Sequence, residues 1–238
     1  MCIIAIYDRT RGQSPDRETL ERMIKGNPDG AGVAWNDGAR VHFRKGIDNA
    51  KHVLQIYNEV KDEALTFVFH ARIATSGGVS AQKCHPFPIS SSNKALDITI
   101  YDGTRPCAFH NGIFRLTPEE GLNDTQTLIK TMLAPLYQAD PQGVENGKHD
   151  ALIAHLTRDN RFVILTPDAC RIYGTWHKDD QGAKYSNMGF KPAPLYSWKA
   201  YGDGYTAWAN RTSTGSHDES LASEGYIPAK YRSRWWND

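Results

Sequence analysis

The stretch Met1-Cys2-Ile3-Ile4-Ala5-Ile6-Tyr7 opens the chain, and the rest of the sequence is organised around it. The unbroken apolar run from Ile3 to Tyr7 predicts a buried strand that starts at once. A strand of this kind holds the residue before it against the core, where a reactive group can be kept still. The sequence therefore presents Cys2 as a side chain anchored beside the first strand.

Cys2 is small enough for methionine aminopeptidase to remove Met1, which would leave Cys2 as the terminal residue. One residue would then carry both a thiol and a free α-amine. The amine titrates near about 7.7 and the thiol near about 8.5, so at neutral pH the amine can accept the thiol's proton. Activation of a nucleophile by its own terminal amine is a known catalytic route. Many proteins have a small second residue without this role, so the interpretation needs support from other segments.

Length and composition indicate one large domain, or one domain with an appendage, in 238 residues. The apolar fraction of 39% and the charged fraction of 23% are typical of a soluble globular protein. A formal net charge of +1 is too small an excess of positive charge to indicate binding to nucleic acid or an acidic membrane. Neither a run long enough to span a membrane nor a secretory signal is expected. We therefore expect no membrane association, and a nucleic-acid partner is disfavoured.

The four cysteines are far apart and form no C-x-x-C pair: Cys2, Cys84, Cys107 and Cys170. In a chain of this length, that spacing favours free thiols in a reducing cytoplasm. Three histidines, at positions 70, 85 and 110, lack the spacing of a metal-binding motif, so we expect no metal site.

The chain order of predicted elements is strands, a helix, several strands, two helices and more strands, which is typical of a mostly antiparallel α+β protein with helices layered on sheets. A helix is expected to open at Ser14-Pro15-Asp16, with a cap residue followed by proline at the first position. Turn residues predict hairpins around Asn36-Asp37-Gly38, Asp102-Gly103 and Pro167-Asp168. Helices are expected over 14–25, 49–61, 124–137 and 142–156, and strands over 31–35, 40–44, 64–70, 96–101, 105–110, 161–166 and 170–174.

Segment 71–88 shows no periodicity and predicts a long loop at the end of a central strand, where functional sites tend to lie. Arg72 enters this loop, and its planar guanidinium suits bidentate binding of a carboxylate. A purely structural arginine is the alternative.

Two further pairs of residues follow predicted elements. Asn111-Gly112 ends a strand, and it is either a hairpin turn or a pair of N–H donors that form an oxyanion hole. Asn123-Asp124 begins a helix, where one residue caps it with Gln126 in a capping box. The Asp124 carboxylate could also bind a substrate ammonium group. The glycine-rich segment 27–32 lacks the pattern of a phosphate loop, and we interpret it as tight packing beside the first strand.

The combined parts would suit an α-amino acid held by its head group while a thiol attacks its side-chain amide. In these segments the sequence resembles class II glutamine amidotransferases, which are N-terminal-nucleophile hydrolases with a four-layer αββα sandwich. The resemblance covers residues 2–190 and rests on five segments in order: Cys2, His70-Ala-Arg-Ile-Ala-Thr75, Cys84-His-Pro-Phe87, His110-Asn-Gly112 and Asp124-Thr125. Ile73 stands where the family often has an aromatic residue, and Gln126 stands where an acid is usual.

The resemblance implies a role for each matching residue. Cys2 would be the nucleophile, with Asn111 and the Gly112 N–H as the oxyanion hole. The substrate-binding residues would be Arg72 and Thr75 at the α-carboxylate, Asp124 at the α-ammonium, and His85 and Phe87 from the third segment. Tyr185-Ser186-Asn187 faintly matches the family's late Ser-Asn segment.

The implied reaction is hydrolysis of glutamine through a thioester, without a cofactor, with the ammonia supplied to a separate synthase subunit. The alternatives are a hydrolase of another γ-glutamyl amide, and a non-catalytic binding protein of the same fold if Met1 is retained. We expect a domain over 1–200 and an aromatic, basic extension over 201–238. This extension would pack on the domain or a partner rather than bind single-stranded nucleic acid. The sequence does not specify the oligomeric state.

Overall fold

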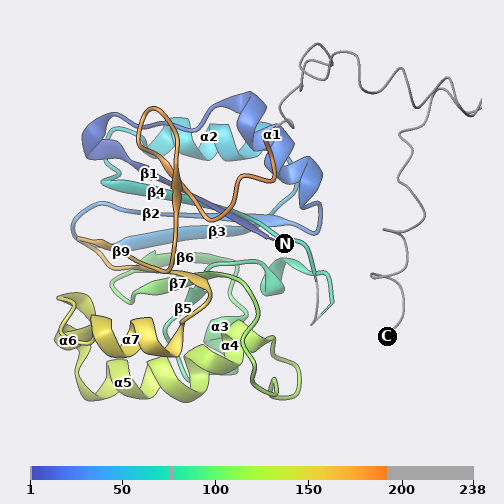
Figure 1. Ribbon diagram of the computed structural model, residues 1–238. Coiled ribbons are helices and arrows are strands. Elements are labelled where there is room, and N and C mark those ends of the chain that lie inside the picture. The colour runs from blue at the N-terminus through green and yellow to red at the C-terminus, as the bar shows by residue number, and fades with distance from the viewer. Residues whose placement is uncertain (1, 75–77, 192–238) are drawn as a thin grey trace, which may run out of the picture. The chain divides into compact units, whose positions relative to one another are not determined.

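Two antiparallel sheets lie face to face between two layers of helices (Figure 1). The computed structural model describes residues 2–74 and 78–191. The chain divides into units of residues 1–192 and 193–238. The predicted boundary near residue 200 and the 201–238 extension lie outside the described residues and stay predictions. The predicted α+β class and its four-layer αββα arrangement are confirmed.

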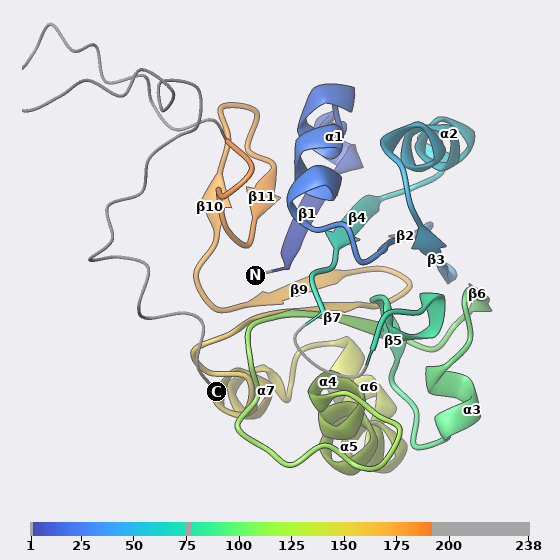
Figure 2. The same ribbon diagram turned by 90° about the vertical axis from the view of Figure 1, so that its right-hand side faces the viewer.

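The first sheet has seven strands in the order β10-β11-β1-β4-β2-β3-β6, all antiparallel. Figure 2 shows β11, β1, β4 and β2 side by side in that order. The first strand, β1, is therefore central, with β4 on one side and β11 on the other. The strands are β1 (Ile3–Asp8), β2 (Ala31–Asn36), β3 (Val41–Ile47), β4 (Thr66–Ala71), β6 (Ile100–Gly103), β10 (His177–Lys178) and β11 (Lys184–Tyr185).

The second sheet has four antiparallel strands in the order β5-β7-β8-β9. Its strands are β5 (Phe87–Pro88), β7 (Cys107–Asn111), β8 (Arg161–Leu165) and β9 (Cys170–Tyr173). The β8–β9 pairing confirms the predicted hairpin around Pro167-Asp168.

The helices cover the outer faces of both sheets, with α1 and α2 over the first sheet and α5 to α7 over the second (Figure 1). The N-caps of α1 and α2 are Asp16 and Asn49, each of which accepts a hydrogen bond from a backbone N–H three residues later. The helices are η1 (Arg9–Arg11), α1 (Arg17–Gly26), α2 (Ala50–Val60), η2 (Ala81–Lys83), α3 (Asn93–Leu96), α4 (Asp124–Leu128), the π-helix η3 (Ile129–Leu133), α5 (Ala134–Ala139), α6 (Pro141–Glu145) and α7 (Asp150–Leu156).

Three apolar clusters fill the three spaces between these four layers. In β1, Ile3, Ala5 and Tyr7 belong to the cluster that includes residues of α1 and α2. Ile4 and Ile6 point the other way and belong to the cluster between the sheets. This alternation follows the two-residue period of a strand, and the run is apolar throughout because both faces are covered. The third cluster joins the second sheet to its helices.

Some sequence expectations about secondary structure were wrong. The strands on either side of Asp102-Gly103 do not form a hairpin, because β6 pairs with β3 and β7 pairs with β5 and β8 in the other sheet. Helix α1 begins after Asp16, which caps it instead of Ser14. The helix expected over 142–156 is two helices, α6 and α7, separated by a turn that contains Gly147 at φ +86°. The predicted loop 71–88 contains η2 and β5.

Among the described residues, no helix is long and apolar enough to cross a membrane.

Candidate active site

Cys2 directly precedes β1 and lies beside the chain that leaves β4. The pairing of Ile3 with Ala71 sets this register. The backbone N–H of Ile73 donates a hydrogen bond to Cys2 Sγ, and Sγ donates one to the Ile73 carbonyl, each at 3.4 Å. The predicted anchoring of Cys2 by the first strand is therefore confirmed.

Burial is the largest influence on the thiol, and it raises the pKa of Cys2 above its ordinary value. The Ile73 N–H and the Arg72 guanidinium oppose this effect without cancelling it. At neutral pH the side chain is therefore mainly a thiol, and it needs a base to become a nucleophile.

Arg72 follows β4 directly, and its side chain is buried, with 4% of the residue exposed. Its positive charge lowers the pKa of both Cys2 and Cys84, and Arg72 directly precedes Ile73, whose main chain holds Cys2 Sγ. The structure thus brings Arg72 together with Cys2, as expected. Thr75, its predicted helper, lies outside the described residues.

The glycine-rich segment 27–32 holds the Arg72 loop in place. Arg72 N donates to Gly30 O at 2.9 Å, and Asp29 N donates to Arg72 O at 3.0 Å. The Asp29 carboxylate accepts a hydrogen bond from Ala74 N at 2.7 Å. We expected this segment to lie beside the first strand, which was wrong, because β4 separates β2 from β1. This contact of Asp29 was not expected from the sequence.

The expected tight packing of this segment is confirmed at two glycines. A Cβ on Gly32 would lie 1.9 Å from the His85 carbonyl oxygen. Gly30 has φ +105°, and a Cβ there would lie 2.7 Å from Cys84 Sγ. Only glycine lets the 84–85 backbone approach β2 this closely.

Asn111 and Gly112 end β7 next to the first sheet. The Asn111 side chain is buried, and its Nδ2 donates a hydrogen bond to Ser186 Oγ at 2.8 Å. An amide nitrogen carries two hydrogens, so a second N–H is left for another acceptor. Gly112 is exposed, and a Cβ there would lie 1.9 Å from Asn160 Oδ1, so glycine is required.

Asp124 is the first residue of α4, and Asn123 caps the helix in a capping box with Gln126, as predicted. The Asp124 carboxylate accepts hydrogen bonds from Phe114 N at 3.0 Å and Thr125 N at 2.8 Å. The Thr125 hydroxyl in turn lies 2.8 Å from His110 Nδ1. These contacts attach the start of α4 to the end of β7, so Asp124 and Asn111 lie on neighbouring segments.

The segment after β11 reaches the start of β1. Ser186 Oγ accepts a hydrogen bond from Ile4 N at 2.8 Å, and Ser186 N donates to Ile4 O at 2.9 Å. Asn187 Nδ2 donates to the Cys2 carbonyl at 2.8 Å. The faint family match of Tyr185-Ser186-Asn187 was the only signal for these residues in the sequence, and it implied no role for them.

His85 and Phe87 lie in the interior rather than on an open surface. The rings of His85 and His70 have centroids 4.3 Å apart, and none of their nitrogens has a hydrogen-bond partner among the described residues. Burial lowers the pKa of His70 to about 3 and that of His85 well below its ordinary value. Phe87 is fully buried, with Lys45 Nζ 4.6 Å from its ring centroid. The substrate roles of His85 and Phe87 stay predictions.

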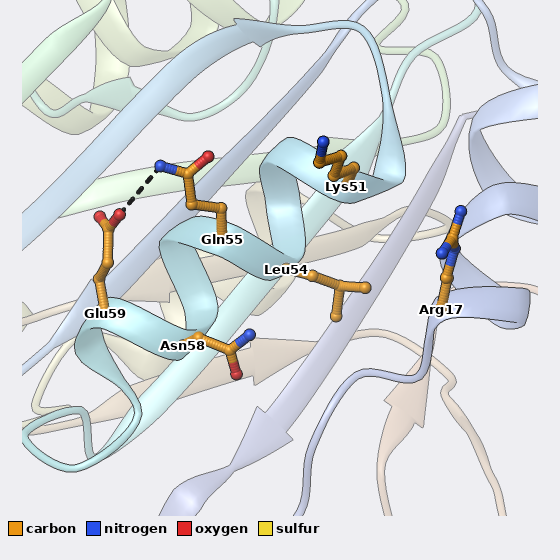
Figure 3. Close-up of a pocket in the computed structure, with 6 residues that line it drawn as sticks. All are labelled: Arg17, Lys51, Leu54, Gln55, Asn58 and Glu59. Carbon is orange, nitrogen blue, oxygen red and sulfur yellow. Dashed lines mark hydrogen bonds between the residues drawn. The ribbon is translucent and has the colours of Figure 1, made fainter.

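No group of three or more metal-ligating side chains comes together in the part of the chain that the structure describes. One surface hollow lies between α1 and α2, lined by Arg17, Lys51, Leu54, Gln55, Asn58 and Glu59 (Figure 3). It shares no residue with the site around Cys2. Another hollow, of about 580 Å³, begins directly after Gly112 and is lined by Ile113, Phe114, Arg115, Leu156, Arg158, Asp159 and Asn160.

Comparison with known proteins gave one curated relative and several solved structures, while no family model matches the chain. The relative is an amidophosphoribosyltransferase from Methanocaldococcus jannaschii, 33% identical over 66 residues. That match covers 27% of this chain and 14% of the relative.

Two solved structures are similar over part of their length. One is a glutamine phosphoribosylpyrophosphate amidotransferase from B. subtilis complexed with ADP and GMP, with 15% identity and a TM-score of 0.45. The other is described as the allosteric regulatory enzyme of purine biosynthesis, with 15% identity and a TM-score of 0.46. Each similarity covers 78% of this chain and 41% of the solved chain. The chain is thus similar to amidotransferases, the class that its motifs resemble, and it spans a minor part of their length.

Proposed function

We propose that this chain is a glutamine amidotransferase domain that hydrolyses the side-chain amide of glutamine, with Cys2 as an N-terminal nucleophile. The observation that carries the proposal is the position of Cys2 Sγ. It is held by the Ile73 main chain at the head of a central strand, beside the buried Arg72. The shared class of the curated relative supports the same activity.

The reaction begins once Met1 is removed. The α-amine of Cys2 takes the thiol proton, and the thiolate attacks the Cδ carbonyl of glutamine, forming an S–C bond. The tetrahedral intermediate collapses as its C–N bond breaks, and the proton from the ammonium group goes to the departing ammonia. Water then attacks the γ-glutamyl thioester, which releases glutamate and returns the proton to sulfur.

The oxyanion of each tetrahedral intermediate would accept hydrogen bonds from Asn111 Nδ2 and Gly112 N. Each such donor contributes roughly 3–4 kcal/mol to lowering the barrier. The exposed backbone at Gly112 and the second Asn111 N–H supply these donors. Because both belong to a strand end held by packing, little reorganisation is needed when the charge develops.

The head group of glutamine would be bound by charge. Arg72, with Thr75, would hold the α-carboxylate, and Asp124 the α-ammonium. His85 and Phe87 would complete the substrate-binding set. Binding both charged groups fixes the side-chain amide relative to the sulfur.

The ammonia would pass to a separate synthase subunit. We place the protein in the cytoplasm, since all four cysteines are free thiols.

The test is glutamine hydrolysis together with covalent trapping. Ammonia release from free glutamine is expected for the wild type and is lost in Cys2→Ala, whose circular dichroism spectrum stays unchanged. A glutamine-mimicking electrophile should label Cys2, as shown by peptide mass mapping, and intact mass should show loss of one methionine. Labelling elsewhere, or activity in Cys2→Ala, would overturn the proposal.

A second candidate is the hydrolysis of a γ-glutamyl amide larger than glutamine. The hollow that begins after Gly112 favours it, because it offers space and two arginines beside the proposed oxyanion donors. Activity on a γ-glutamyl dipeptide without activity on glutamine would select this candidate. A protein that retains Met1 and hydrolyses neither substrate would be a binding protein of the same fold.

A further inference from the structure

One hydroxyl joins the two sheets at the candidate site. Ser186 Oγ accepts hydrogen bonds from Ile4 N in the first sheet and from Asn111 Nδ2 in the second, both at 2.8 Å. All three residues are buried, with Ser186 only 1% exposed. A serine oxygen has two acceptor lone pairs, so these two donors use both. The Asn111 amide is therefore held with its nitrogen toward the strand that carries Cys2.

The next residue contacts the nucleophile itself. Asn187 Nδ2 donates to the Cys2 carbonyl at 2.8 Å, while Asn187 Oδ1 accepts a hydrogen bond from Gly189 N at 3.0 Å. Both ends of this side-chain amide are engaged, so it is a rigid support. Restraining the Cys2 carbonyl limits rotation of the terminal residue, and with it the direction of Sγ and of the α-nitrogen.

We propose that Ser186 and Asn187 are positioning residues. They fix the orientation of the Asn111 amide, the proposed oxyanion donor, relative to the nucleophile Cys2. This inference rests on the proposed function. Ser186 acts through Asn111, and Asn187 acts through Cys2. The segment that follows β11, about 180 residues from the nucleophile along the chain, thus completes a site that begins at the amino terminus. Outer residues of this kind typically change activity by about 10- to 100-fold.

The two roles predict different results in two assays, the hydrolysis of glutamine and the alkylation of Cys2 by iodoacetamide. Glutamine hydrolysis needs both an oriented nucleophile and an oxyanion donor. Alkylation of Cys2 by iodoacetamide needs only the nucleophile, because no oxyanion forms. A residue that acts through Asn111 should therefore affect hydrolysis alone, whereas one that acts through Cys2 should affect both.

For Ser186→Ala we expect kcat for glutamine to fall about 10- to 100-fold with little change in KM, and no change in the alkylation rate of Cys2. In Asn111→Ala, the added Ser186→Ala should have almost no further effect, since both act through one donor. Ser186→Cys, with a weaker acceptor of similar size, should be intermediate. Equal losses of hydrolysis and alkylation, or additive effects in the double variant, would overturn the role of Ser186.

For Asn187→Leu we expect slower alkylation of Cys2 as well as slower hydrolysis, each by about tenfold. Asp180→Asn, at an exposed position in the turn before β11, is the matched control and should change neither. Melting temperatures are measured for all variants, and assays are run well below them, because Ser186→Ala leaves Ile4 N without its acceptor.

The two proposals fail in different ways. A wild type that hydrolyses no glutamine overturns the proposed function, and the role of Ser186 falls with it. The alkylation rate of Asn187→Leu still decides the role of Asn187, because that measurement needs no substrate. An unchanged rate would overturn it.

Discussion

The carboxylate of Asp29 accepts a hydrogen bond from the backbone N–H of Ala74 at 2.7 Å. These residues belong to different loops, one before β2 and one after β4. Together with the two backbone hydrogen bonds of Arg72, this contact ties the segment that carries the guanidinium to the loop directly before β2. The position of Arg72 therefore depends on a side chain 43 residues earlier in the sequence.

Replacing Asp29 with alanine should loosen the Arg72 segment. We expect Asp29→Ala to raise KM for glutamine by about tenfold with a smaller effect on kcat, because the loss is in substrate binding. Asp29→Asn keeps an oxygen acceptor for Ala74 N and should stay within about threefold of wild type. Steady-state kinetics of the three proteins give the answer. A larger loss in Asp29→Asn than in Asp29→Ala would contradict this role.

If the planar guanidinium of Arg72 binds the substrate carboxylate, glutamine binding should weaken when that group is replaced by a lysine ammonium of the same charge. Arg72→Lys keeps the positive charge but loses the planar fork, so glutamine should bind at least about tenfold more weakly. The measurement is KM for glutamine. Because Arg72 is buried, the melting temperatures of the variants must be compared as well. Arg17→Lys, at an exposed position of α1, serves as the control. An unchanged KM in a folded Arg72→Lys protein would exclude the carboxylate role.

The burial of Cys2 predicts the pH dependence of its reactivity. Burial raises the pKa of the thiol, so the thiolate forms at a higher pH than in an exposed cysteine. We expect the rate of Cys2 alkylation by iodoacetamide to rise with pH, with a midpoint above the ordinary value of about 8.5. Mass spectrometry of the Cys2 peptide separates it from the other three thiols. A midpoint below about 8 would show that neighbouring positive charge, such as that of Arg72, outweighs burial.

The buried pair His70 and His85, whose ring centroids lie 4.3 Å apart, predicts loss of stability in mild acid. Both have folded pKa values below the unfolded value of about 6.5, so below that pH the unfolded chain binds more protons. The stabilising contribution is complete above about pH 6.5 and is lost as the pH falls towards the folded values. Electrostatic repulsion by His110 and Arg72 lowers the pKa of both histidines, and Lys45 also lowers that of His85.

Between about pH 6 and pH 5, each histidine should lower the free energy of unfolding by about 1 kcal/mol per pH unit. His70→Leu should remove about half of the combined slope that the two histidines contribute. His52→Gln, at an exposed position of α2, should leave the slope unchanged. Urea unfolding at a series of pH values measures the slope. Equal slopes in wild type and His70→Leu would show that the His70 imidazole does not contribute to the slope.

The predictions from sequence were most accurate where the residues of a helix or strand determine its type and its start without help from distant segments. The apolar run 3–7 and the β-prone run 64–70 are strands because neither face can be left in water. Asn49 marks the start of α2 because its side chain caps the helix locally. The predictions failed at residues 96–110, where turn chemistry is compatible with a hairpin but each strand finds a better-matched partner in a different sheet. Pairing depends on the whole layer, which short-range patterns do not contain.

The sequence by itself determined the strand that anchors Cys2, the α+β class and the set of residue types suited to amide chemistry, because these follow from local hydrophobic periodicity and from the chemistry of single side chains. Only the tertiary structure decided which residues support the site. It brought Asp29 to Ala74, Ser186 to Asn111 and Asn187 to Cys2, and it placed His85 and Phe87 in the interior. Contacts between positions up to 185 residues apart arise from the packing of two sheets, and no local pattern encodes them.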